Sequence, residues 1–141
     1  MLIHLYLVIE NKTEMYKARI SYHIVFVTKY RKKVLSSNVL ELVEEVLEYA
    51  ASRHNFSITA FDLENQDHIH LVIEARPTQS VSKLVQLMKQ YTRYHAWQKY
   101  APWLRKFYWY KNFLWRSGYF CSSLGNVSKE TILEYVECQN E

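Results

Sequence analysis

Residues 68–75, His-Ile-His-Leu-Val-Ile-Glu-Ala, constrain the fold more than any other part of the chain. Side chains alternate along a β-strand, so Ile69 and Leu71 share one face while His68 and His70 share the other. The apolar face has to be covered, which predicts a sheet with helices on one face and an open second face. The two imidazoles then project from the open face, with Cα atoms about 7 Å apart.

The rest of the chain supplies the elements that such a sheet needs. β-branched and aromatic residues predict strands, and apolar residues at helical spacing predict helices. A Pro close to a helical pattern marks its start or its end. The predicted elements are a strand over 18–29, a helix capped by Asn38 and Glu41, strands near 57–64 and 68–75 joined at 65–67, a helix from Pro77-Thr78 to Pro102, a strand over 115–121, and a final helix capped at Asn126–Ser128.

This order of elements predicts an α+β fold of the ferredoxin-like, or RRM-like, split βαβ type. Its four-stranded antiparallel sheet carries two helices, and a further helix follows at the C-terminus. No linker or repeat interrupts the chain, so we expect a single domain over residues 15–141. Residues 1–14 are an N-terminal extension of unknown role, either an extra edge strand or a translation start upstream of Met15.

Composition excludes several classes of protein. The 141 residues include only 2 Gly and 2 Pro, and Gly118 and Gly125 fit neither common nucleotide-binding fingerprint. The 2 Cys, Cys121 and Cys138, cannot form a disulfide framework or a four-thiolate zinc site. No run approaches the ~20 apolar residues of a membrane span. We therefore expect a cytoplasmic protein without a nucleotide cofactor and without a membrane partner.

The positive charge is concentrated in one half of the chain. No Asp or Glu occurs between Glu74 and Glu130, and aromatic residues such as Trp97, Trp109 and Tyr110 are interleaved with the basic ones there. Cations beside stacking platforms are typical of single-stranded nucleic-acid binding, although a solvated basic face is the alternative. The predicted DNA-binding residues are Arg31, Lys32, Lys33, Lys83, Lys89, Arg93, Arg105, Lys106, Lys111 and Arg116.

His68 and His70 are candidate metal ligands. Their separation on one strand face lets both imidazoles reach a single divalent ion. The alternative is a pair of surface histidines that bind nothing. A metal site would also need at least one ligand from elsewhere in the chain.

The predicted terminal helix offers such a ligand. Tyr135 and Gln139 are four residues apart and so lie on the same helical face. The Gln carbonyl oxygen is acceptable to Mg²⁺ or Mn²⁺. Glu134 and Glu137 are alternative oxygen donors, and an ordinary amphipathic helix would also explain the pattern.

Three segments together resemble the single-tyrosine HUH transposases of the smallest prokaryotic insertion sequences, the TnpA type. They are Tyr22–Lys33, Asp67–Ile73 with the His-x-His pair, and Gly125–Gln139. The similarity runs from about Met15 to the C-terminus. Three motifs in the right order and spacing are far more specific than the histidine pair alone.

The resemblance implies a transposase that cuts and rejoins single-stranded DNA at hairpin-marked ends. Tyr135 would be the nucleophile and would form a 5′-phosphotyrosine intermediate. His68, His70 and Gln139 would hold Mg²⁺ or Mn²⁺. Members of this family are homodimers in which the subunits share active sites.

Two other functions remain open at this point. One is a domesticated or relaxase-like nuclease with the same chemistry. The other is a non-catalytic ferredoxin-like module that only binds nucleic acid, which the basic and aromatic residues alone would explain. A covalent protein–DNA adduct would separate catalysis from binding.

Overall fold

The computed structural model describes residues 18–125. Two sequence predictions lie outside them: the extension 1–14, and the final helix with Tyr135, Gln139 and the alternative donors Glu134 and Glu137. In chain order the elements are β1 (Ile20–Val27), the short 3-10 turn η1 (Lys29–Arg31), α2 (Ser37–His54), β2 (Ser57–Glu64), β3 (His68–Ala75), α3 (Val81–Tyr108) and β4 (Phe120–Gly125).

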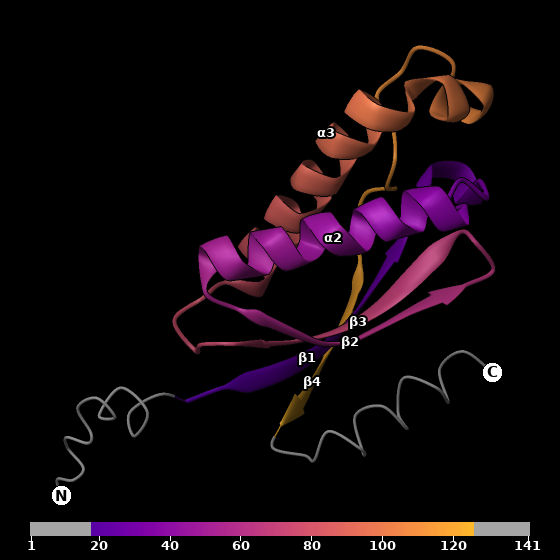
Figure 1. Ribbon diagram of the computed structural model, residues 1–141. Coiled ribbons are helices and arrows are strands. Elements are labelled where there is room, and N and C mark those ends of the chain that lie inside the picture. Colours follow the sequence, from indigo (N-terminus) through magenta and orange to yellow (C-terminus); the bar gives the residue numbers. More distant parts are fainter. Residues whose placement is uncertain (1–17, 126–141) are drawn as a thin grey trace, which may run out of the picture.

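The four strands form one antiparallel sheet in the order β2-β3-β1-β4. This is the strand order of the split βαβ plan, so the predicted ferredoxin-like α+β fold is confirmed. Figure 1 shows α2 and α3 together on one face of the sheet, with the end of α3 extending beyond it. The site described below lies on the other face of the sheet, which we call the open face because neither α2 nor α3 covers it, although His70 on this face is only 4% exposed.

The core lies between the helices and the sheet. Alternation along β1 and β3 directs one set of side chains toward the helices, and the helices meet them with residues at helical spacing. The fully buried members include Ile24, Phe26, Ile69, Leu71, Ile73, Val43, Leu47 and Met88. The helices therefore cover the face of the sheet that carries Ile69 and Leu71, as the sequence predicted.

Helix α2 starts earlier than predicted. Its N-cap is Ser36, whose hydroxyl accepts a hydrogen bond of 3.3 Å from the backbone N–H of Val39, so the predicted cap at Asn38 is wrong. Ser and Asn are equally good caps, and the extended backbone of Ser36 decides between them. The helix ends at His54, and its C-cap Asn55 adopts the left-handed conformation (φ 61°) that Asn tolerates.

Helix α3 also departs from the prediction, because Pro102 does not end it. The helix begins at Val81, capped by Ser80, and continues through Pro102 to Tyr108. The backbone adjusts at Tyr100 (φ −124°, ψ 32°), two residues before the proline. A kink at this position relieves the clash of the proline ring with the preceding turn, so the helix continues.

The last described strand, β4, begins at Phe120 rather than at Trp115, so it overlaps the predicted range 115–121 only at residues 120 and 121. Trp115 forms only an isolated bridge to Thr28, and the chain turns at Gly118 (φ 84°) before β4 begins at Phe120. The buried indole of Trp115 donates a 2.8 Å hydrogen bond to the hydroxyl of Thr92 on α3. Trp115 is therefore used to join this segment to the helix rather than to extend the strand.

Leu71→Ala should cost about 2–5 kcal/mol of unfolding free energy, because a fully buried leucine leaves a cavity under the helices. Urea unfolding followed by circular dichroism measures the change. Glu44→Ala on the exposed face of α2 is the control and should stay within about 0.5 kcal/mol. A cost for Leu71→Ala no larger than that of the control would contradict the proposed core.

Candidate functional site

The open face of the sheet carries the two predicted histidines. His68 and His70 project from β3, the strand between β2 and β1. Across β2 the register pairs His68 with Glu64, and across β1 it pairs His70 with Val25. Neighbouring strands thus add side chains to the same face as the histidines.

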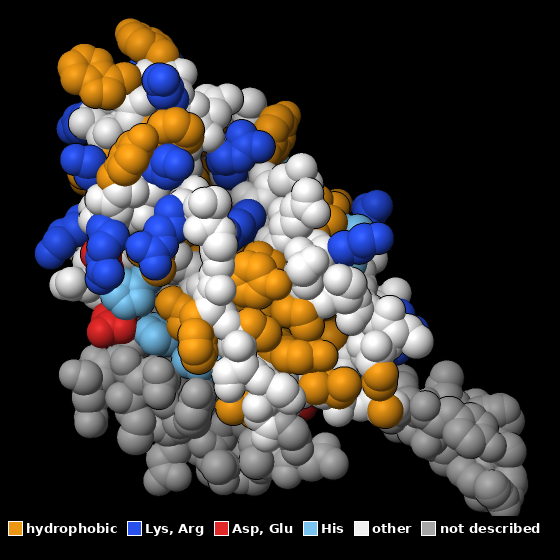
Figure 2. All heavy atoms as spheres, turned by 180° about the vertical axis from the view of Figure 1, so that it is seen from behind, with side chains coloured by type: hydrophobic (Ala, Val, Ile, Leu, Met, Phe, Trp, Pro, Cys, Tyr) orange, Lys and Arg blue, Asp and Glu red, His pale blue; other side chains and the backbone are white. Residues whose placement is uncertain are grey.

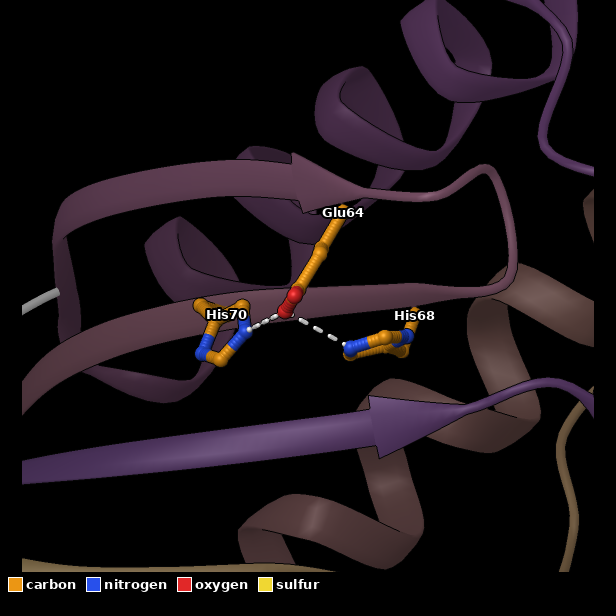
Figure 3. Close-up of side chains that lie close together, drawn as sticks. All are labelled: Glu64, His68 and His70. Carbon is orange, nitrogen blue, oxygen red and sulfur yellow. Dashed lines mark hydrogen bonds and ion pairs between the residues drawn. The ribbon is translucent and has the colours of Figure 1, made fainter. Parts of the chain in front are cut away.

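Three of these side chains converge on a single point (Figure 3). Glu64 Oε1 lies 2.8 Å from His68 Nε2 and 2.9 Å from His70 Nε2. One potential ligand atom from each of the three residues lies within 4.8 Å of the others. We call Glu64, His68 and His70 the His–Glu cluster. Among the described residues it is the one group of His, Cys, Asp or Glu side chains arranged in this way.

The β2–β3 turn places Glu64 in the cluster. Asn65 and Gln66 both have positive φ, and the N–H of Asp67 donates to the carbonyl of Glu64. A tight turn of this kind fixes the register of a hairpin, and the register sets Glu64 opposite His68. The sequence analysis predicted both strands of this hairpin but did not identify Glu64, although pairing the two strands would have pointed to it.

Each histidine is also held at its second ring nitrogen. His68 Nδ1 lies 2.6 Å from Asp67 Oδ1, and His70 Nδ1 lies 3.0 Å from Nε2 of His23 on β1. The rings of His23 and His70 are inclined by only 12°, so the shared hydrogen bond lies nearly in the plane of both. Contacts of this kind commonly fix the orientation of metal-binding histidines. The sequence analysis missed both Asp67 and His23 in this role.

The electrostatics of the cluster suit a cation. The hydrogen bond from His70 lowers the pKa of Glu64 below its ordinary value, so Glu64 is a carboxylate at neutral pH. Burial, assisted by the charge of His70, lowers the pKa of His23 to about 4. His23 is therefore a neutral partner that adds no positive charge beside the ligand atoms.

The cluster fits the metal that the family resemblance implies. Two imidazole nitrogens and one carboxylate oxygen are a common donor set for divalent ions, and the carboxylate suits Mg²⁺ and Mn²⁺. His68 and His70 are brought together as predicted. Gln139, the third predicted ligand, lies outside the described residues, whereas Glu64 supplies an oxygen within them.

The predicted DNA-binding residues do not share one environment. Arg31 makes a 3.4 Å ion pair with buried Asp67, which places it beside the His–Glu cluster. The Lys89 ammonium donates to the backbone carbonyls of Arg116 (2.9 Å) and Gly118 (2.6 Å). Lys89 thus ties the turn before β4 to α3. Lys32, Lys33, Lys83, Arg105, Lys106, Lys111 and Arg116 are exposed, and Arg93 is half-buried.

Basic side chains gather next to the histidines on the face shown in Figure 2. Lys29, Lys89, Arg93 and Arg116 line a cleft of about 410 Å³ between α3 and the segment that leads to β4. We call it the basic cleft.

No helix within residues 18–125 has the length and apolar character needed to cross a membrane.

Comparison with known proteins agrees with this geometry. A curated relative, the ISDra2 transposase TnpA of Deinococcus radiodurans, is 27% identical over 79 residues. That match covers 56% of this chain and 56% of the relative, so it spans just over half the length of each.

Two solved structures share the fold. One, from Deinococcus radiodurans R1 and described as a candidate transposase, has a TM-score of 0.69 at 24% identity and covers 89% of this chain and 94% of its own. The other is a REP-associated tyrosine transposase bound to a REP hairpin, with a TM-score of 0.59 at 12% identity, covering 86% of this chain and 64% of its own.

The family profile described as "Transposase IS200 like" matches residues 16–139, nearly the whole chain. The match takes in all three segments on which the family resemblance depends, including the one beyond residue 125. With the shared fold and the histidines on its open face, this shows that the chain belongs to the IS200-like transposase family.

Proposed function

We propose that this protein cuts and rejoins single-stranded DNA at hairpin-marked ends of an insertion sequence, with Tyr135 as the nucleophile. The observation that carries the proposal is the convergence of His68, His70 and Glu64 on the open face of the sheet, in a chain of the IS200-like family. The basic cleft supports a polyanionic substrate.

The tyrosine step conserves the bond energy of the DNA backbone. The phenol oxygen of Tyr135 attacks a phosphorus, the bond to the 3′ oxygen breaks, and the phosphate remains joined to the tyrosine through its 5′ side. The 3′-hydroxyl of another strand can then reverse the reaction without a nucleotide cofactor. A phenol has a pKa near 10, so its proton must be removed during the attack.

The His–Glu cluster would hold Mg²⁺ or Mn²⁺ through Nε2 of His68, Nε2 of His70 and the Glu64 carboxylate. A bound divalent ion polarises the phosphate and stabilises charge on the leaving oxygen. Gln139 is the further ligand implied by the family resemblance. Sites for these ions are usually six-coordinate, which leaves room for both Glu64 and Gln139.

The resemblance also supports hairpin recognition and a homodimer with shared active sites. One solved structure with this fold is described as bound to a REP hairpin. Because a shared site places the tyrosine of one subunit beside the histidines of the other, the dimer would be the catalytic unit.

Tyr135→Phe removes one oxygen and should abolish the covalent protein–DNA adduct while leaving DNA binding unchanged. The assay uses single-stranded oligonucleotides carrying the palindromes that flank the gene, with adducts resolved by denaturing electrophoresis. Peptide mapping of the wild-type adduct should place the DNA on Tyr135. An adduct in the Phe variant, or on another tyrosine, would contradict the nucleophile assignment.

His68→Ala should reduce cleavage to background in Mg²⁺ or Mn²⁺ while hairpin affinity stays within about twofold, because the basic cleft is untouched. Gel shifts and cleavage assays on the same oligonucleotides measure both. EDTA should have the same effect on the wild-type protein. Cleavage by His68→Ala at the wild-type rate would mean that the metal site is elsewhere.

His23→Phe keeps a ring of similar size but removes the nitrogen that contacts Nδ1 of His70. Affinity for Mn²⁺, measured by titration calorimetry, should fall about 10- to 100-fold, the usual cost of losing a residue that orients a metal ligand. His23→Gln, whose amide oxygen can accept a hydrogen bond, should recover part of it.

His54→Phe is the matched control for His23→Phe. This substitution removes the 3.0 Å hydrogen bond between His54 on α2 and Tyr91 on α3, which lies on the helical side of the sheet. Mn²⁺ affinity should stay at the wild-type value. If His23→Phe also kept wild-type affinity, His70 would be oriented without His23.

A further inference from the structure

A second hollow lies directly beside the His–Glu cluster. It has a volume of about 420 Å³ and is formed between β1 and the segment that leads into β4. Val25 and Val27 contribute from β1, and Tyr119 and Phe120 contribute aromatic rings. We call it the β1–β4 hollow. Val25, Val27, Tyr119 and Phe120 have no role in the function proposed above.

The register fixes how close this hollow is to the cluster. Val25 pairs with His70 across β1 and β3, and Val27 pairs with His68. The ring of Phe120 meets the ring of His23 edge-on, with 5.7 Å between centroids. Whatever occupies the hollow therefore lies one strand away from the proposed metal ligands.

The hollow and the basic cleft adjoin the same segment of the chain. Arg116 and Ser117 line both of them. The segment between them is fixed, because Lys89 holds the carbonyls of Arg116 and Gly118, and the N–H of Arg116 donates to the Val27 carbonyl at 2.8 Å. The cleft and the hollow therefore share one preformed wall, and groups bound in the two of them are neighbours.

The cleft and the hollow differ in chemistry. The cleft presents Lys29, Arg93 and Arg116, which suit backbone phosphates. The hollow presents aliphatic side chains and two aromatic rings, with Phe120 50% exposed. An aromatic face beside cations suits the flat face of an unpaired base rather than a phosphate. Pockets of about 300–1,000 Å³ hold small organic ligands, so a nucleobase fits in the available space.

We propose that the β1–β4 hollow binds the unpaired nucleobase next to the phosphate that is cut, while neighbouring phosphates lie in the basic cleft. This site rests on the proposed function only for the position of the cut phosphate. It makes the enzyme's preference for single strands a property of the protein surface, because a paired base cannot enter the hollow.

The test compares oligothymidylate of eight nucleotides with a fully abasic oligomer of the same length and charge, in EDTA so that no cleavage is needed. In the wild-type protein, NMR should show contacts between thymine protons and the methyl groups of Val25 and Val27. The abasic oligomer should bind more weakly. Losing a base stacked on an aromatic ring costs about 5- to 150-fold in affinity.

Phe120→Leu keeps an apolar contact on His23 but removes the stacking face, and should reduce the preference for thymidylate over the abasic oligomer at least fivefold. Tyr49→Leu on α2 is the matched control, because Tyr49 is equally exposed (51%) but lies on the helical side. It should keep the wild-type preference. Unchanged Mn²⁺ affinity in Phe120→Leu would show that His23 and His70 are undisturbed.

Two results would overturn the site. One is binding of oligothymidylate that shifts only residues of the basic cleft, with no contact to Val25 or Val27. The other is a shift of these valines with protein concentration in the absence of DNA, which would assign the hollow to a second copy of the chain. Neither result depends on Tyr135, so a failure here and a failure of the cleavage mechanism remain distinguishable.

Discussion

Strand β3 links the stability of this protein to the geometry of its site. The strand lies between β2 and β1 and packs Ile69, Leu71 and Ile73 beneath the helices. The same pleat directs His68 and His70 to the opposite face. A slip of one residue in register would turn the histidines toward the helices and the leucine away from them, so the hydrophobic core itself enforces the position of the ligands.

Asp67 connects this strand to its surroundings. One carboxylate oxygen contacts His68, the other forms the ion pair with Arg31, and the backbone carbonyl accepts from Thr28 at the end of β1. One buried residue therefore orients a ligand, fixes the β2–β3 turn against β1, and holds a basic side chain next to the cluster. The turn is part of the site as much as the strands are.

The sequence predicted what is encoded locally. Strands 57–64 and 68–75 have the predicted bounds because alternation and turn residues act within a few positions. The start of β4 was mispredicted because a tertiary contact, that of Trp115 with Thr92, decides it. The cap of α2 and the continuation of α3 past Pro102 were mispredicted because the backbone conformations at Ser36 and Tyr100 decide them. Glu64 and His23 required strand pairing, which no local pattern reveals. Tyr135 and Gln139 rest on the family motif alone.

Lys89 shows why a count of basic residues overstates the contacts with DNA. Its ammonium is half-buried against two carbonyls, and burial together with the charge of Arg116 lowers its pKa. The charge of Arg31 is likewise partly balanced by Asp67. The salt dependence of binding reports only the phosphates that are neutralised. For single strands, the slope of log K against log salt concentration falls by about 0.7 for each such phosphate. We therefore expect Lys89 to contribute to DNA affinity mainly by holding the binding surfaces in place. The exposed cations, including Arg31 with its side chain 56% exposed, would carry most of the electrostatic attraction.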